Sequence, residues 1–147
     1  MDQDRKTYKG LIHSLPQNGI FVFGSNTEGR HGAGTAKIAV DKYGAKYGQA
    51  RGLQGRSYGL ITTNLRARIQ PGVTKEAIIS EIKILYAVAE QNPDLEFYVT
   101  HNNLGRNLCH YTNLQMAEMY GASNFIPSNI IFEEGFWPDV QKFYIEK

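Results

Sequence analysis

The sequence predicts a single α/β domain in which a mostly parallel, mixed sheet is covered by helices on both faces. Three observations carry this prediction. The chain has 147 residues, a length typical of one domain with its own core. Short apolar runs that suit buried strands alternate along the chain with segments of helical periodicity. The sequence has no internal repeat, low-complexity tract or linker, so residues 1–147 are expected to form one unit.

Four short segments have the composition of buried strands. They are Ile20–Phe23, Ser57–Thr62, Phe97–Thr100 and Ile130–Phe132. The first is fully apolar and ends at Gly24, where a glycine-rich loop is expected to begin. After the last strand, a terminal helix or extension is expected from Phe136 to Ile145.

The segments between these strands have the marks of helices. Apolar residues recur at roughly helical spacing beyond Gly34, which predicts a helix that begins near that residue. A second helix has one apolar face over Ile78–Ala89, and Thr74 can cap its first turn. Thr112 and Gln115 fit a capping box, in which each side chain bonds the other's backbone at the start of a third helix.

The composition is that of a globular protein without a membrane partner. No stretch approaches 18 uninterrupted apolar residues, so no transmembrane helix is expected. The segment Met1–Lys6 lacks the apolar core of a signal peptide, and the single cysteine, Cys109, cannot form an internal disulfide. A cytoplasmic location is therefore expected.

The net charge of +2 hides a strong asymmetry along the chain. Residues 1–73 contain 11 basic and 4 acidic side chains, a balance of +7, whereas residues 74–147 contain 5 and 10, a balance of −5. Of the 15 glycines, 12 lie in the first part. A basic, glycine-rich half indicates that an anionic partner binds near it, and the alternative is chance clustering on solvated faces.

In sheets of this class, ligands bind beyond the carboxyl ends of the strands. Three loops are expected there, at residues 24–34, 63–72 and 101–111. In the first, the amides of 32–36 are expected to point outward at a helix N-terminus, where the helix dipole favours phosphate. Arg30 and His31 add charge or hydrogen bonds in the same loop. The alternative is that these glycines only form a tight turn.

Familiar motifs do not account for this loop. A P-loop that starts at Gly24 needs Lys followed by Ser or Thr but meets Arg30 and His31, and a dinucleotide fingerprint that starts at Gly32 meets Lys37 at its last position. The four histidines are scattered, so no metal site and no cofactor is expected. Cys109 is interpreted as a small buried hydrophobe rather than a nucleophile.

The residues of the first loop carry a resemblance to a known family. The segment Val22–Asn26, followed by Gly32–Ala39, resembles the first ligand loop of macrodomains, which are ADP-ribose-binding modules with a three-layer α/β/α fold. Together with Gly52–Tyr58, it is similar to small macrodomain-like proteins of bacteria and phages. The resemblance is strong over residues 20–62. It implies a small phosphorylated ligand, such as ADP-ribose or a related nucleoside diphosphate.

The resemblance also implies roles for single residues. Asn26 matches the asparagine that bonds the distal ribose, and residues 32–36 match the loop that wraps the diphosphate. The segment Val99–Gly105 matches a second phosphate loop. The expected ligand-binding residues are Gly24, Ser25, Asn26, Arg30, Gly32, Ala33, Gly34, Thr35, Ala36, Thr100, Asn102, Asn103, Leu104 and Gly105. Thr35 stands where a hydrolytic subclass has aspartate, and Leu104 stands where an aromatic ring usually stacks on the distal ribose.

Three functions remain open from the sequence. The first is binding of an ADP-ribose-like ligand with hydrolysis of an ADP-ribosyl bond or phosphoester, for which Asn26, His31 and His101 are the candidate catalytic residues. The second is a reader or scaffold that binds without turnover, which the lack of paired carboxylates near the loops favours. The third, nucleic-acid binding through the basic half, has no familiar motif to support it.

Overall fold

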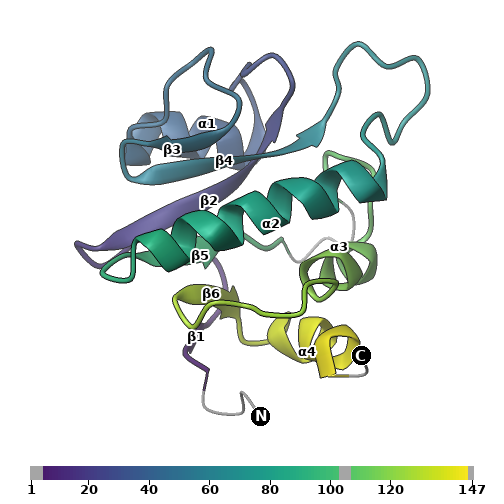
Figure 1. Ribbon diagram of the computed structural model, residues 1–147. Coiled ribbons are helices and arrows are strands. Elements are labelled where there is room, and N and C mark those ends of the chain that lie inside the picture. The colour runs from purple at the N-terminus through teal and green to yellow at the C-terminus, as the bar shows by residue number, and fades with distance from the viewer. Residues whose placement is uncertain (1–4, 103–106, 146–147) are drawn as a thin grey trace.

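The computed structural model describes residues 5–102 and 107–145, which contain six strands and four helices. The strands are β1 (Thr7–Tyr8), β2 (Gly19–Asn26), β3 (Gly52–Gln54), β4 (Ser57–Thr63), β5 (Glu96–Val99) and β6 (Ile130–Glu133). The helices are α1 (Gly34–Tyr43), α2 (Lys75–Gln91), α3 (Asn113–Tyr120) and α4 (Trp137–Ile145). Strands and helices alternate along most of the chain, as the sequence predicts (Figure 1).

The strands form one six-stranded sheet in the order β1-β6-β5-β2-β4-β3. All neighbouring strands are parallel except β3, which runs antiparallel to β4. The sheet is therefore mixed but mostly parallel, and the carboxyl ends of five strands meet at one edge. We call this edge the carboxyl edge.

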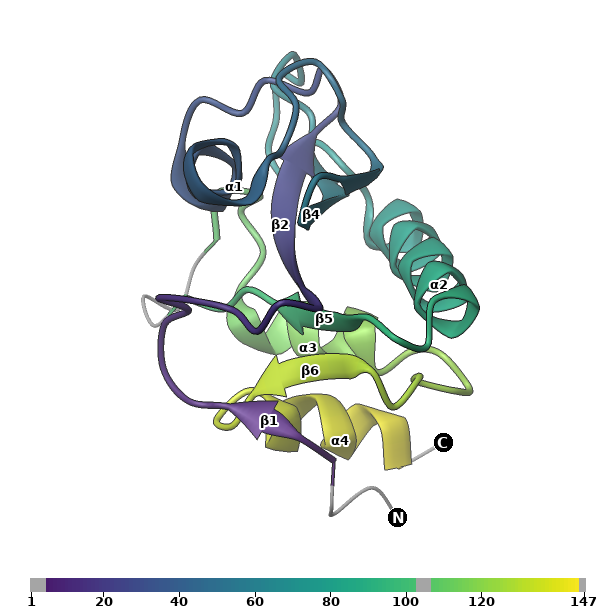
Figure 2. The same cartoon turned by 90° about the vertical axis from the view of Figure 1, so that its left-hand side faces the viewer.

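Helices cover both faces of the sheet and give three layers. The larger core cluster lies between the sheet and α2, α3 and α4, and alternate residues of β2 such as Ile20 and Val22 contribute to it. Phe21 and Phe23 face the other way and pack with Ala36, Ala39 and Tyr43 of α1 and its end. Figure 2 shows α1 on one side of β2 and β4 and α2 on the other. The predicted fold class is confirmed.

The sequence signals for helix starts are confirmed at atomic level. Thr74 Oγ1 accepts a hydrogen bond from Ala77 N at 3.1 Å at the start of α2. At the start of α3, Gln115 N donates to Thr112 Oγ1 at 3.1 Å and Thr112 N donates to Gln115 Oε1 at 2.8 Å. These reciprocal bonds form the predicted capping box.

The strand prediction was incomplete in two respects. β1 and β3 were not predicted, because strands of two and three residues are too short to show alternation. β2 continues through Gly24, Ser25 and Asn26, which the sequence had placed in a loop. The physical reason is the ladder with β4, in which Gly24 pairs with Leu60 and Ser25 with Ile61.

Over residues 5–102 and 107–145, no helix is both long enough and apolar enough to cross a membrane.

Candidate functional site

Two neighbouring strands lead to opposite faces of the sheet at the carboxyl edge. β2 leads into α1 on one face, and β5 leads toward α3 on the other. Their ladder spans Gly19 to Val22 of β2, and Thr100 N donates to Val22 O at 3.2 Å just beyond it. β2 then continues to Asn26 beside β4. Such a reversal is the usual ligand site of open α/β sheets.

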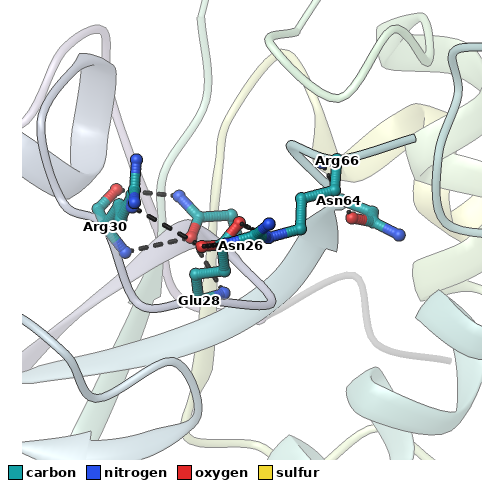
Figure 3. Close-up of polar contacts among 5 residues, drawn as sticks. All are labelled: Asn26, Glu28, Arg30, Asn64 and Arg66. Carbon is teal, nitrogen blue, oxygen red and sulfur yellow. Dashed lines mark hydrogen bonds and ion pairs between the residues drawn. The ribbon is translucent and has the colours of Figure 1, made fainter. Parts of the chain in front are cut away.

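Asn26, at the end of β2, organises the loop that follows. Its side chain is nearly buried, at 8% exposure. Oδ1 accepts from the backbone nitrogens of Glu28 at 3.2 Å and Arg30 at 3.0 Å, and Nδ2 donates to Arg30 O at 2.7 Å (Figure 3). The carboxamide therefore holds residues 26–30 in one conformation. Its contact with a ribose stays a prediction. The amide has a second N–H that takes no part in these three hydrogen bonds.

Glycine is required where this loop meets the segment after α1. Gly29 has φ +68°, and a Cβ there would lie 2.5 Å from the carbonyl carbon of Gly48. Gly48 N also donates to Gly29 O at 2.8 Å. The backbones are thus in direct contact, which holds the loop against the segment after α1.

His31 lies inside this loop rather than on its surface, with 3% exposure. Nε2 lies 2.8 Å from Gln49 O, and because a carbonyl only accepts, Nε2 carries the proton. The ring edge contacts Phe23 at a centroid distance of 5.0 Å. Nδ1 is buried and has no hydrogen-bond partner among the described residues. The contacts of His31 are those of a structural residue, and its catalytic role stays a prediction.

The N-terminus of α1 faces solvent and has no side-chain cap. Ala33 is the N-cap residue in extended conformation, and the first turn contains no acidic residue. Gly32, Ala33 and Gly34 are all exposed, whereas Ala36 is buried. The positive end of the helix dipole is therefore accessible, as the phosphate prediction requires.

Three other predicted ligand residues, Thr35, Gly24 and Ser25, make contacts at the end of β2. Thr35 Oγ1 accepts from Gly24 N at 3.3 Å, so the helix start is bonded to the end of β2. Gly24 itself is exposed, and Ser25 is buried with its hydroxyl donating to Asn26 O at 3.3 Å. Of these three, Gly24 alone offers an exposed position at the carboxyl edge.

Two arginines share one carboxylate where the loops after β2 and β4 meet. Arg66, in the loop after β4, donates from Nε and Nη2 to the two carboxylate oxygens of Glu28 at 3.1 and 3.2 Å. Arg30 Nε lies 3.6 Å from Glu28 Oε1 (Figure 3). The arginine side chains are 60% and 76% exposed, for Arg30 and Arg66, so these ion pairs are weak and screened. The cluster carries a net charge of +1.

Sequence reasoning missed Glu28 and Arg66 as members of the site. The loops after β2 and β4 were both expected to be ligand loops, but no motif marks Glu28 in the first or Arg66 in the second. Their proximity follows from the sheet, because Thr27 N donates to Thr63 O at 3.0 Å where the two loops begin. A contact across 38 residues leaves no local pattern in the sequence.

The loop after β5 is held by asparagines. Asn102 Nδ2 donates to Asn107 Oδ1, and Asn113 Nδ2 donates to Asn102 O at 2.9 Å. Asn107 Nδ2 in turn donates to Asn113 Oδ1 at 3.1 Å. The predicted ligand residue Asn102 is therefore part of a structural network. Of the other predicted residues in this loop, Thr100 is half-buried, and Asn103, Leu104 and Gly105 lie outside the described residues.

The loops after β2 and β5 meet at the start of α1. A Cβ on Gly34 would lie 2.8 Å from Leu108 Cδ1, so Leu108 lies directly against the helix N-terminus. Its side chain is otherwise exposed. The exposed start of α1 is thus contacted by Leu108 of the loop after β5.

His101 lies at the carboxyl end of β5 beside Glu133, the last residue of β6. His101 Nε2 is 3.9 Å from Glu133 Oε1, and the two side chains are 13% and 11% exposed. The imidazole also packs on Phe136 at a centroid distance of 4.9 Å. Burial lowers the pKa of His101, while the nearby carboxylates of Glu133 and Asp139 oppose that shift. Sequence reasoning named His101 but not Glu133.

Cys109 is buried beside Met116, and its burial raises the pKa of the thiol, which agrees with its interpretation as a small hydrophobe. Within residues 5–102 and 107–145, no group of three or more His, Cys, Asp or Glu side chains is placed to hold a metal ion.

Comparisons of this chain with protein-family models, with curated proteins and with solved structures found no match.

Proposed function

We propose that the carboxyl edge binds a small phosphorylated ligand of the ADP-ribose type. The observation that carries the proposal is the uncapped, exposed N-terminus of α1 at the place where β2 and β5 lead to opposite faces of the sheet. Backbone amides at such a terminus bind phosphate oxygens without a counter-charge from a side chain. The proposal therefore rests on backbone geometry rather than on one side chain.

In this proposal the diphosphate lies against the amides of 32–36. Arg30 and Arg66 neutralise part of its charge, because their shared partner Glu28 compensates only one of the two guanidinium groups. Asn26 keeps the loop in shape and directs its remaining amide N–H to the ligand's ribose. Leu108 supplies an apolar contact at the same helix end.

Two outcomes are compatible with such a site, namely hydrolysis of an ADP-ribosyl bond or phosphoester, and binding without turnover. The side chains of Asn26 and His31 are bonded to backbone groups of the protein itself, which favours the reader over catalysis by those two residues. Hydrolysis requires another proton-transfer group at the same edge.

Calorimetric titration with ADP-ribose tests the proposal, with a pair of variants at Ala33. Ala33→Asp supplies a favourable helix cap but places a negative charge where the phosphate is proposed to bind, and Ala33→Ser supplies a neutral cap. Both variants should fold at least as stably as the parent protein. Ala33→Asp should bind ADP-ribose about tenfold more weakly or worse, and Ala33→Ser should lose much less.

Absence of heat at millimolar ADP-ribose, or unchanged binding in a folded Ala33→Asp protein, would contradict the proposed function.

A further inference from the structure

The loop between β4 and α2, residues 64–74, projects beyond the end of β4 (Figure 1). It presents two large aliphatic side chains to solvent, since Ile69 is 81% exposed and Leu65 is 50% exposed. We propose that this loop docks the protein onto an anionic lipid bilayer. In this arrangement the two aliphatic side chains enter the boundary of the hydrocarbon, and the arginines of the loop bind lipid phosphates.

Two carboxamides inside the loop hold its conformation. Asn64 Oδ1 accepts from Arg66 N at 3.0 Å, and Gln70 Nε2 donates to Asn64 O at 3.1 Å. At the other end of the loop, Gly72 N donates to Gln70 Oε1 at 2.9 Å. The neutral polar side chains are thus bonded within the loop, while aliphatic ones are exposed. An exposed pair of large apolar residues on an ordered loop indicates an interaction surface.

The two sides of the loop are in direct contact. A Cβ on Gly72 would lie 2.7 Å from Ala67 Cβ and 2.9 Å from Asn64 O. Ala67 N also donates to Asn64 O at 3.3 Å. The inside of the loop is therefore occupied by backbone and small side chains, which keeps Leu65 and Ile69 outside it. Backbone groups that are bonded within the loop also lower the cost of moving it out of water.

The charges of the loop select an anionic partner. Arg66 and Arg68 lie between the two aliphatic residues in sequence, and residues 64–74 contain no acidic side chain. Arg66 pairs with Glu28 but keeps 76% of its side chain exposed, and Arg68 is exposed as well. Guanidinium groups bind phosphate oxygens in the headgroup layer, and neighbouring aliphatic side chains reach the acyl chains below it. The loop therefore matches both layers of an anionic bilayer surface.

The composition of the loop favours a bilayer over a nucleic acid. Residues 64–74 contain no Phe, Tyr or Trp, so they offer no ring on which a base could stack. Leucine and isoleucine are among the side chains that enter hydrocarbon most favourably. The sequence predicted no membrane partner because it contains no spanning segment. Docking through a surface loop requires no such segment, so that prediction does not bear on this loop.

Co-sedimentation of the full chain with vesicles tests the proposal. At about 50 mM salt, vesicles of equal parts phosphatidylglycerol and phosphatidylcholine should bind the protein at least about tenfold more tightly than pure phosphatidylcholine. Ile69→Ser should weaken this binding about tenfold, and Arg68→Gln about fivefold. The matched controls are Ile84→Ser and Lys83→Gln, which change exposed residues of the same types on α2 and should bind as the parent protein does.

Three results would overturn the proposal. The first is a parent protein that does not sediment with the anionic vesicles, and the second is unchanged binding by both Ile69→Ser and Arg68→Gln. The third is the absence of vesicle binding together with duplex DNA binding or dimer formation that Ile69→Ser abolishes, which would assign the loop to that partner. Ile69→Ser should also bind ADP-ribose as the parent protein does, so the proposed function and this inference are tested separately.

Discussion

Single polar side chains shape the loops at the carboxyl edge. Asn26 makes three hydrogen bonds to the backbone of residues 28–30, and Asn102, Asn107 and Asn113 bond one another across the loop after β5. A buried carboxamide is well suited to this work because it offers donors and an acceptor on one rigid group. Loops held in this way are preorganised, which lowers the entropy lost when a ligand binds.

The cost of losing Asn26 can be predicted from these bonds. Asn26→Ala leaves the backbone nitrogens of Glu28 and Arg30 without their acceptor, so we expect the free energy of unfolding to fall by about 1–3 kcal/mol. Asn64→Ala is the control, because Asn64 makes the analogous contact with Arg66 N at 3.0 Å but its loop is more exposed. Urea denaturation should find a loss of less than about 1 kcal/mol there. Equal losses in the two variants would contradict this role of Asn26.

His101 should also make stability depend on pH. Burial holds its pKa in the folded protein below the ordinary value of 6.5, so the unfolded chain binds the proton more readily. The contribution of the neutral ring to stability is therefore complete above about pH 6.5 and is lost as the pH falls toward the folded-state pKa. Urea denaturation at pH 7.5 and 5.5 should find a smaller loss for His101→Gln than for the parent protein. The same loss in both proteins would show that His101 does not titrate in this way.

At the scale of elements, the start of α1 is the structural centre of the site. It is bonded to β2 through Thr35 and Gly24, and it contacts the loop after β5 through Leu108. Gly34 joins these features, because its φ of +60° and its contact with Leu108 both exclude most side chains. The amides proposed to hold phosphate therefore depend on one glycine.

Alanine variants of Gly34 and Gly32 compare a strained, crowded position with an unstrained, open one. Gly34→Ala forces alanine into the left-handed region and brings its Cβ to 2.8 Å from Leu108 Cδ1, so stability should fall by about 1–2 kcal/mol. Gly32 has no such φ, and nothing lies within 4 Å of a Cβ there, so Gly32→Ala should change stability by less than about 0.5 kcal/mol. Thermal unfolding distinguishes the two. A Gly34→Ala protein as stable as the parent would mean that the turn adopts another conformation.

Local signals predicted the helices of this fold better than its strand ends. The helix caps can be recognised in the sequence, because a cap and its partner lie within three residues of each other, as for Thr74 and for Thr112 with Gln115. The strand at residues 24–26 cannot be recognised in this way, since a glycine, a serine and an asparagine favour a turn in isolation. They are extended here beside β4. At residues 24–26, strand pairing with β4 therefore outweighs the local preference for a turn.

At the scale of the whole molecule, the two oppositely charged halves of the sequence partly neutralise one another. Arg51 pairs with Glu81 of α2 at 2.6 Å, and Lys6 pairs with Glu96 of β5 at 3.0 Å. Arg56 donates to Pro16 O. Arg51 and Arg56, which precede the second predicted strand, are therefore engaged away from the ligand loops, whereas Arg30 and Arg66 lie in the loops after β2 and β4.

The candidate site was predictable only where it is continuous in sequence. The glycine-rich segment and the start of α1 are contiguous, so the sequence predicted both the helix start and residues 32–36 as a place for phosphate, and the structure confirms the helix start. The pairs Arg66 with Glu28 and His101 with Glu133 join residues more than 30 positions apart, and only the order of the strands brings them together.

The central claim is that the amides at the start of α1 bind phosphate groups of an ADP-ribose-like ligand. The most direct measurement is an amide proton–nitrogen NMR titration of the labelled protein with ADP-ribose, with ribose as the control that lacks phosphate. The account predicts that the largest shifts occur at residues 32–36, with smaller ones at Arg30 and Arg66, and that ribose leaves these signals unchanged. Absence of shifts at millimolar ADP-ribose, or shifts confined to residues away from the carboxyl edge, would contradict it.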